Sequence, residues 1–138
     1  GLITIPAGGS RKPSGTETVR EKDHLLRMQG SAVFRAAVRH LEHAIVDVLK
    51  EFGVSAADVT RFIAHQANAR ILEQLRRRLR LSQEAIYSVI ERYGNTSSAS
   101  LPIALDCAVR EQRLAAGDVV VLAAFGGGLT WATGLVRW

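Results

Sequence analysis

The sequence predicts an α/β domain whose largely parallel sheet carries helices on both faces. Apolar runs typical of buried strands alternate along the chain with segments of helical period, which is the pattern of βαβ units. The 138 residues, 47% hydrophobic and 22% charged, have the size and composition of one globular domain able to bury a core. Parallel strands joined by helices need cover on both sides, so we expect two helical layers around the sheet.

The first third of the chain predicts a loop followed by a long helix. Residues 1–26 read mostly as loop, because residues 6–24 contain three Gly and two Pro with little periodicity. From Val33 onward, apolar residues recur at intervals of three and four, which predicts an amphipathic helix that ends before Gly53. Ser55 to Asp58 resembles a capping box and predicts a short helical turn.

Two strand-to-helix units are expected in the rest of the chain. The first has a buried strand over 59–64, the polar segment His65-Gln66-Ala67-Asn68 and a helix over 69–79. The second has a turn at Ser82, a strand over 86–90, a small-residue loop over 94–100 and a helix over 101–114. A turn at 116–118, a strand over 119–125, three glycines and a last strand over 130–136 complete the domain.

Charge and cysteine content limit the class of protein. Eighteen Lys and Arg against 13 Asp and Glu give a net charge of +5, which favours nucleic acid, anionic lipid or an acidic protein as a partner. Six arginines and a single acid, Glu73, lie between Arg61 and Arg80, either as a solvated helix face or as a partner surface. One cysteine cannot form an internal disulfide, so we expect a reducing compartment, the cytoplasm.

The chain shows no sign of membrane insertion or secretion. No apolar run reaches the roughly 18 residues of a membrane span, and the first residues do not resemble a signal peptide. The start, which lacks Met, suggests a chain cut from something longer.

Three loops that are expected to follow strands hold the residues with chemical potential. They are 65–68, 94–98 and 126–128, and the carboxyl ends of parallel strands are where binding groups converge. Taken singly, each loop has a structural explanation: a satisfied histidine, a turn at Gly94-Asn95, or a glycine loop that lacks the Lys-Ser/Thr of a phosphate-binding motif. His40 and His43 are three apart on a helix but lack a third metal ligand nearby.

Four segments together resemble the C-terminal half of a β-ketoacyl-acyl-carrier-protein synthase III, a condensing enzyme of the thiolase fold. They are Arg27-Met28-Gln29-Gly30-Ser31-Ala32-Val33-Phe34, His65-Gln66-Ala67-Asn68-Ala69-Arg70, Tyr93-Gly94-Asn95-Thr96-Ser97-Ser98-Ala99-Ser100 and Ala124-Phe125-Gly126-Gly127-Gly128-Leu129-Thr130-Trp131. The resemblance extends nearly from Leu2 to Trp138. It implies one domain over 1–138, the C-terminal half of a thiolase-like fold, with a mixed sheet flanked by helices on both faces.

By this resemblance, His65 and Asn95 match the histidine and asparagine of a Cys-His-Asn triad. Their N–H groups would stabilise the enolate formed when a malonyl thioester loses CO₂, chemistry that needs no metal or other cofactor. Gly127 matches the oxyanion-hole loop and would present its backbone N–H to the acyl thioester oxygen. Asn68 and Gly30 match positions that line the pantetheine arm of acyl-CoA or carrier protein, and Met28, Phe34 and Phe125 would give that path apolar walls.

Arg70 matches a basic residue with which the family docks its acidic acyl carrier protein. On a helix, Arg70 and Arg77 lie on nearly the same face, with Arg78 beside them, so the resemblance favours a partner surface over a solvated face. Base readout is disfavoured because no aromatic or Asn/Gln ladder accompanies the arginines. We therefore expect neither nucleic acid nor membrane as a partner.

The nucleophilic cysteine of the family is absent. Cys107 falls within an expected helix, without a helix N-terminus or a neighbouring cation to activate its thiol, so we expect it to be inert. A Cys-bearing N-terminal half would then be required, in a complete enzyme that we expect to be a homodimer, and this half alone would expose an apolar helical face. Two functions stay open: the His/Asn half of a working acyl-condensing enzyme, or a noncatalytic half that binds carrier protein or supports structure.

Overall fold

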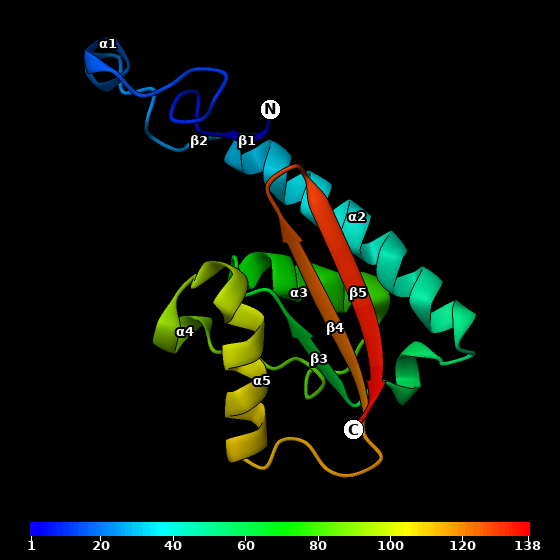
Figure 1. Cartoon of the computed structure of the whole chain (residues 1–138). Helices are drawn as coiled ribbons and strands as arrows, with labels where there is room; N and C mark the ends of the chain where they lie inside the picture. The colour runs from blue at the N-terminus through cyan, green and yellow to red at the C-terminus, as the bar shows by residue number, and fades with distance from the viewer.

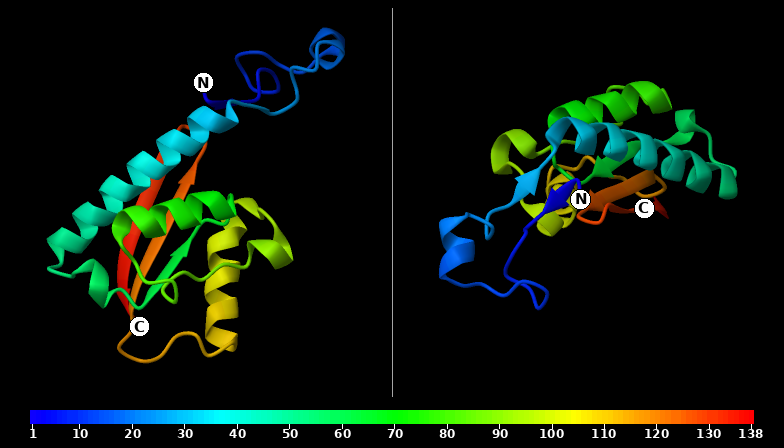
Figure 2. Two further views of the ribbon diagram at one scale, coloured as in Figure 1. Left: turned by 180° about the vertical axis from the view of Figure 1, so that it is seen from behind. Right: turned by 90° about the horizontal axis from the view of Figure 1, so that it is seen from above.

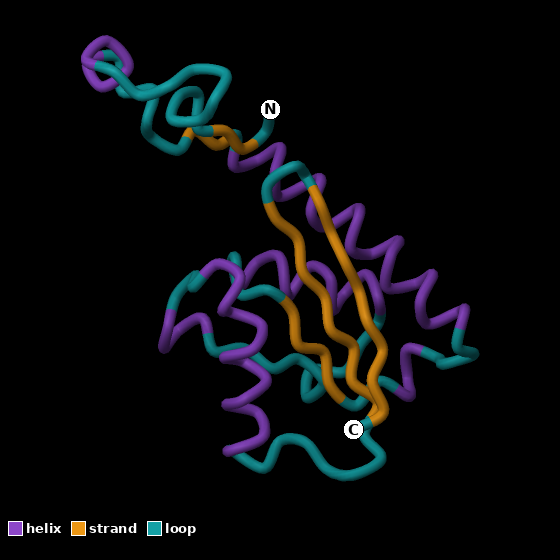
Figure 3. The backbone as a smooth tube through the Cα atoms, in the orientation of Figure 1, coloured by secondary structure: helices purple, strands orange, loops and turns teal.

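A computed structural model describes residues 1–138 as a three-stranded sheet between helices, with an N-terminal arm (Figure 1). The helices are α1 (Thr16–Arg20), α2 (Gly30–Glu51), α3 (Ala69–Leu79), α4 (Ile90–Tyr93) and α5 (Ser100–Arg110), with single 3₁₀ turns η1 (Ala56–Asp58) and η2 (Ser97–Ala99). The strands are β1 (Ile3–Thr4), β2 (Arg27–Met28), β3 (Arg61–Ala64), β4 (Val119–Gly126) and β5 (Thr130–Arg137). Figure 3 shows the helices and strands along the backbone.

The main sheet is mixed, with the strand order β3-β4-β5. β3 pairs parallel with β4, and β4 pairs antiparallel with β5 along all eight residues of each strand. A parallel pair requires a long crossover, whereas the three residues between Gly126 and Thr130 allow only a hairpin. The expected mixed sheet is therefore confirmed, but its parallel character is confined to one strand pair.

Helices cover both faces of the sheet, as expected. α2 and α3 pack on one face around a core of sixteen buried residues that includes Leu41, Leu75 and Phe62. α5 packs on the other face, where Ile63 and Val120 belong to a core of seven. Successive strand residues point to opposite faces, which is why neighbours such as Phe62 and Ile63 belong to different cores. Figure 2 shows the two layers of helices from behind and from above.

The strand expected over 86–90 does not form. Ile86 makes only an isolated parallel bridge with Phe62, and residues 90–93 are helix α4. The pairing stops because the buried side chain of Gln66 accepts the Val89 N–H through Oε1 at 3.0 Å. A side chain thus takes the backbone donor that a continued strand would have used. α5 also ends at Arg110, short of the expected Leu114.

The expected loop at the N-terminus is partly structured. Residues 1–29, called the arm below, contain helix α1 and the short antiparallel pair β1-β2, and Figure 1 shows them projecting from the rest of the molecule. Asp23 is buried in the arm, where it accepts hydrogen bonds from Lys12 Nζ at 2.5 Å and from Arg27. This ion cluster explains how a segment rich in Gly and Pro holds a defined shape. None of the helices has the combination of length and hydropathy that crossing a bilayer demands.

Candidate active site

A cleft of about 1200 Å³ lies where β3 and β4 end. Its walls come from the arm, the first turns of α2 and α3, the loop around Asn95 and the glycine turn after β4. All the residues predicted to bind or activate substrate line it, together with Arg70: Met28, Gly30, Phe34, His65, Asn68, Asn95, Phe125 and Gly127. Segments far apart in the sequence therefore meet in one place, and only Arg77 of the predicted set lies outside the lining.

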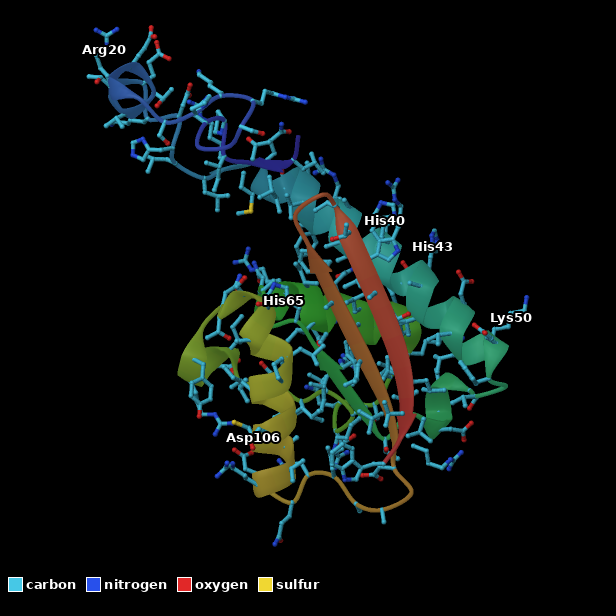
Figure 4. The ribbon with its side chains drawn as sticks, in the orientation of Figure 1. Arg20, His40, His43, Lys50, His65 and Asp106 are labelled. Atoms are coloured by element: carbon cyan, nitrogen blue, oxygen red, sulfur yellow. The ribbon has the colours of Figure 1, made fainter.

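His65 is held in place by its backbone and by its ring. Its backbone N–H donates to the Ala123 carbonyl at 2.7 Å, extending the pairing of β3 with β4 by one residue. Its Nδ1 lies 2.5 Å from Ser100 Oγ, and its ring meets Phe125 edge to face at 5.4 Å. Figure 4 shows His65 beside the first turn of α5 and the start of α3. Burial lowers the pKa of His65 below its ordinary value, which favours a neutral imidazole.

The two asparagines of the cleft have their side-chain oxygens occupied by local backbone. Asn95 Oδ1 accepts the Ser97 N–H at 2.9 Å, and Asn68 Oδ1 accepts the Arg70 N–H at 2.9 Å as the N-cap of α3. An amide whose oxygen is occupied presents its NH₂ to other partners. Both residues line the cleft with NH₂ groups that make no hydrogen bond within the chain, and Asn68 has a structural role that the sequence analysis did not assign to it.

The glycine turn after β4 has two different requirements for glycine. Gly128 has a φ of +143°, and an added Cβ would lie 2.9 Å from the Thr130 backbone nitrogen, so the fold itself requires glycine there. An added Cβ at Gly127 would meet nothing within 4 Å. Gly127 thus borders open space in the cleft, where its backbone can be approached closely.

The arginines of α3 differ in how far they are neutralised. Arg70, in the first turn, is exposed and has no ion-pair partner, whereas Arg77 Nε lies 2.5 Å from Glu73 Oε1. Arg76 binds the same carboxylate, and hydrogen bonds from Arg76 and then Arg77 lower the pKa of Glu73 to about 2. Arg78 pairs with Glu42 of α2 at 2.7 Å. The expected cationic ridge is therefore partly compensated by carboxylates, and its free charge lies next to the cleft.

Sequence reasoning missed two contributors to the site. Arg35 of α2 lines the cleft, which adds a second cationic side chain to Arg70, and Ser100 is buried against His65. Arg35 comes directly after the Arg27–Phe34 segment that the resemblance links to the site, so its position was the available signal. No sequence signal paired Ser100 with a histidine 35 residues away.

His40 and Cys107, two other residues with reactive side chains, both lie outside the cleft lining. His40 stacks on Trp131 with ring centroids 4.1 Å apart, and no group of three or more His, Cys, Asp or Glu side chains is placed to hold a metal. Cys107 is buried on α5 with its Sγ 3.8 Å from Tyr93 Oη, away from the cleft lining. Neither the His40 and His43 pair nor Cys107 is therefore part of the candidate active site.

The chain is similar in sequence to one family of known proteins. The sequence profile described as 3-oxoacyl-[acyl-carrier-protein (ACP)] synthase III C terminal matches residues 49–138. A β-ketoacyl-[acyl-carrier-protein] synthase III from Caldanaerobacter subterraneus is 44% identical over 136 residues, which are 99% of this chain and 41% of that protein. The chain spans about two fifths of the length of the curated relatives it matches.

Solved structures give the same result in three dimensions. A 3-oxoacyl-(acyl carrier protein) synthase III from Pseudomonas aeruginosa matches 99% of this chain and 41% of its own, with a TM-score of 0.86 and 35% identity. The priming β-ketosynthase of the R1128 polyketide pathway matches 89% of this chain and 38% of its own, with a TM-score of 0.79 and 34% identity. The fold is that of the C-terminal half of a thiolase-like 3-oxoacyl-[acyl-carrier-protein] synthase III. The chain belongs to the C-terminal family of 3-oxoacyl-[acyl-carrier-protein] synthase III.

Proposed function

We propose that this chain is the His/Asn-bearing half of an enzyme that condenses an acyl-CoA primer with malonyl-acyl-carrier-protein. The observation that carries the proposal is the placement of His65, Asn95 and Gly127 around one cleft, from three separate loops. The product would be the first β-ketoacyl chain of fatty acid or polyketide synthesis. The complete enzyme would be a cytoplasmic homodimer.

The chemistry asks for hydrogen-bond donors at two oxygens. When the malonyl thioester loses CO₂, the electrons of the broken C–C bond form an enolate whose charge gathers on the thioester oxygen. N–H groups of His65, which is half-buried, and of Asn95, which is exposed in this chain, would stabilise that charge. The enolate carbon then attacks the acyl thioester carbonyl of the partner half, and the cysteine sulfur leaves as a thiolate. The Gly127 backbone N–H would donate to that second carbonyl oxygen.

The outer cleft suits a pantetheine arm and an acidic carrier. Asn68 offers an amide donor, Gly30 borders the cleft where an added Cβ would meet nothing, and Phe34 and Phe125 supply apolar walls. Arg35 and Arg70 lie on the lining, where they would attract a negatively charged carrier protein and its phosphate.

Two features support a requirement for a Cys-bearing N-terminal half. Met28 lines the cleft and is still 58% exposed, so this wall is open on the side of the arm. On α5, Leu101 and Leu105 are half-buried and Val109 is 43% exposed, at a spacing of four residues that places them on one helix face. We propose that the Cys-bearing half packs on this α5 stripe and completes the cleft.

The test compares this chain alone with the assembled enzyme, meaning this chain joined to a Cys-bearing half. Release of labelled CO₂ from malonyl-carrier and formation of β-ketoacyl-carrier are measured for both. We expect both activities only in the assembled enzyme. An assembled enzyme that binds carrier protein but releases no CO₂ would contradict the proposal and favour the noncatalytic, carrier-binding alternative.

A further inference from the structure

Ser100 is the one side chain that binds both the ring of His65 and the backbone beside it. Its Oγ lies 2.5 Å from His65 Nδ1 and accepts the Gln66 backbone N–H at 3.1 Å. Ser100 is only 1% exposed and is the first residue of helix α5, which packs against one face of the sheet through the core of seven residues. Its hydroxyl makes no other hydrogen bond in the structure.

Counting donors and acceptors decides which atom carries the proton. A serine hydroxyl has one O–H and two lone pairs, and the Gln66 N–H already occupies one lone pair. If Ser100 donates its proton to Nδ1, every one of these buried groups is satisfied. If Nδ1–H donates to Ser100 instead, the hydroxyl proton is left without an acceptor in the protein on a residue that is only 1% exposed, which is costly.

We propose that Ser100 is a positioning residue that holds His65 with its proton on Nε2. Nδ1 then accepts the Ser100 hydroxyl, and Nε2, on the opposite edge of the ring, presents its N–H as a donor to the cleft. The catalytic consequence rests on the proposed function, in which His65 donates to an enolate oxygen. The assignment of the proton is a statement about this chain alone.

Gln66 keeps the backbone that follows His65 from moving away from Ser100. Its side chain is completely buried, donates through Nε2 to the Ala64 carbonyl at 2.7 Å and accepts the Val89 N–H at 3.0 Å. The backbone that follows His65 is therefore fixed on both sides, and the Gln66 N–H cannot turn away from Ser100. Ser100 thus works against a rigid loop, which is what a positioning role requires.

The direct test reads the proton position by nitrogen NMR of the assembled enzyme labelled in its histidines. The His65 signals are assigned by their loss in His65→Gln. We expect Nε2–H in the wild type, a mixture of proton positions in Ser100→Ala and restoration in Ser100→Thr, which keeps the hydroxyl. Ser88→Ala is the matched control, because Ser88 also hydrogen-bonds to Gln66 but makes no hydrogen bond to His65. Wild-type protein with the proton on Nδ1, or Ser100→Ala with an unchanged Nε2–H, would overturn the inference.

The kinetic test separates positioning from folding and from the proposed function. We expect Ser100→Ala to lower kcat for malonyl-carrier decarboxylation on the order of tenfold with KM unchanged, and Ser88→Ala to leave both unchanged. A Ser88→Ala loss equal to that of Ser100→Ala would assign the effect to general loosening of the loop and overturn the positioning role. If the wild type releases no CO₂, the proposed function fails, while the NMR result still decides the tautomer.

Discussion

The two predicted donors lie on loops that this chain supports very differently. His65 follows β3 directly and is half-buried; its backbone N–H donates to the Ala123 carbonyl, and its ring Nδ1 is hydrogen-bonded to Ser100 Oγ. Asn95 follows the four-residue helix α4 and is exposed, and its side chain makes one hydrogen bond, to the Ser97 N–H. One donor is fixed by the sheet, and the other only by a local turn.

The contrast shows which of the two predicted donors this chain holds in place by itself. Electrostatic stabilisation depends on donors that are fixed and shielded from water before the reaction starts. This chain supplies those conditions at His65, where burial also lowers the pKa. At Asn95 the amide is oriented but remains in water, so its contribution would depend on the cover supplied by the Cys-bearing half.

Removing each donor is the strongest test of this contrast. In the assembled enzyme, His65→Ala and Asn95→Ala should each slow malonyl-carrier decarboxylation by roughly 10²–10³, the usual loss for one oxyanion donor. Acylation of the partner's cysteine, followed by transfer of labelled acetyl from acetyl-CoA, should suffer less because that step forms no enolate.

Conservative variants sharpen the same comparison. His65→Gln keeps an amide donor near the position of Nε2 and should recover part of the lost rate, whereas Asn95→Asp keeps the shape but replaces the donor by a negative charge and should not. Decarboxylation at wild-type rate in both alanine variants would remove the donor role from these residues.

The arginines of α3 give a second comparison, between Arg77, which is ion-paired with Glu73, and Arg70, which has no ion-pair partner. Arg70→Glu should lower kcat/KM for carrier-bound malonate about tenfold and mimic high salt, since exposed charges mainly steer an acidic partner. Arg77→Glu should do less, because Arg77 is already paired with Glu73. Reaction with the small acyl-CoA should be nearly unchanged in both.

The control for this prediction is Arg110→Glu, an exposed arginine of α5 that is ion-paired with Asp106 and lies outside the cleft lining. We expect it to have no effect on either substrate. Equal losses for carrier and acyl-CoA substrates in Arg70→Glu would mean that Arg70 supports the fold or binds CoA itself.

What the sequence predicted, and what it missed, follows from the range of the interactions involved. The helices over 33–52 and 69–79 and the strands over 59–64 and 119–125 carry their own periodicity, and all four form within a few residues of those bounds. Residues 86–90 have a strand-like composition, but they do not form a strand because the Gln66 side chain, twenty-three residues before Val89, accepts the Val89 N–H. Local pattern cannot report such a distant acceptor.

The site shows the same division. His65, Asn95 and Gly127 stand in motifs that can be read directly, and the cleft brings them together. Ser100 and Arg35 acquire their places only through packing: the first because α5 begins under the His65 loop, the second because α2 passes the cleft. The ion cluster of the arm was missed because Lys12, Asp23 and Arg27 are unremarkable until the chain turns back on itself.

A smaller effect should distinguish His65 from Asn95 through pH. Burial lowers the pKa of His65 in the folded state, while in the unfolded state it stays near 6.5. As pH falls through that value, the unfolded chain takes up a proton first, so stability decreases until pH reaches the folded pKa. The test measures the urea midpoint of unfolding at several pH values between 7.5 and 5. Over this range the midpoint should fall less in His65→Gln than in wild type or Asn95→Ala. Parallel curves for all three would assign no pH-linked stability to His65.

The smallest expected effect concerns Cys107, which lies apart from both donor loops. Condensation needs an acyl-enzyme on an activated thiolate, and Cys107 is buried in α5 against Tyr93, in neither the cleft nor a helix N-terminus. Cys107→Ser should therefore leave decarboxylation and condensation by the assembled enzyme unchanged. The isolated chain should take up no labelled acetyl from acetyl-CoA and form no β-ketoacyl product.

The isolated chain also tests the α5 stripe. We expect it to self-associate, because Val109 is exposed beside the half-buried Leu101 and Leu105. Light scattering on the isolated chain should show a particle well above 15.0 kDa, and adding the Cys-bearing half should replace it with a defined complex. Leu105→Glu, which places a charge on the stripe, should weaken that association while leaving the His65 loop intact. A monomeric chain that acylates itself at Cys107 would contradict both the place of the nucleophile in the other half and the need for that half.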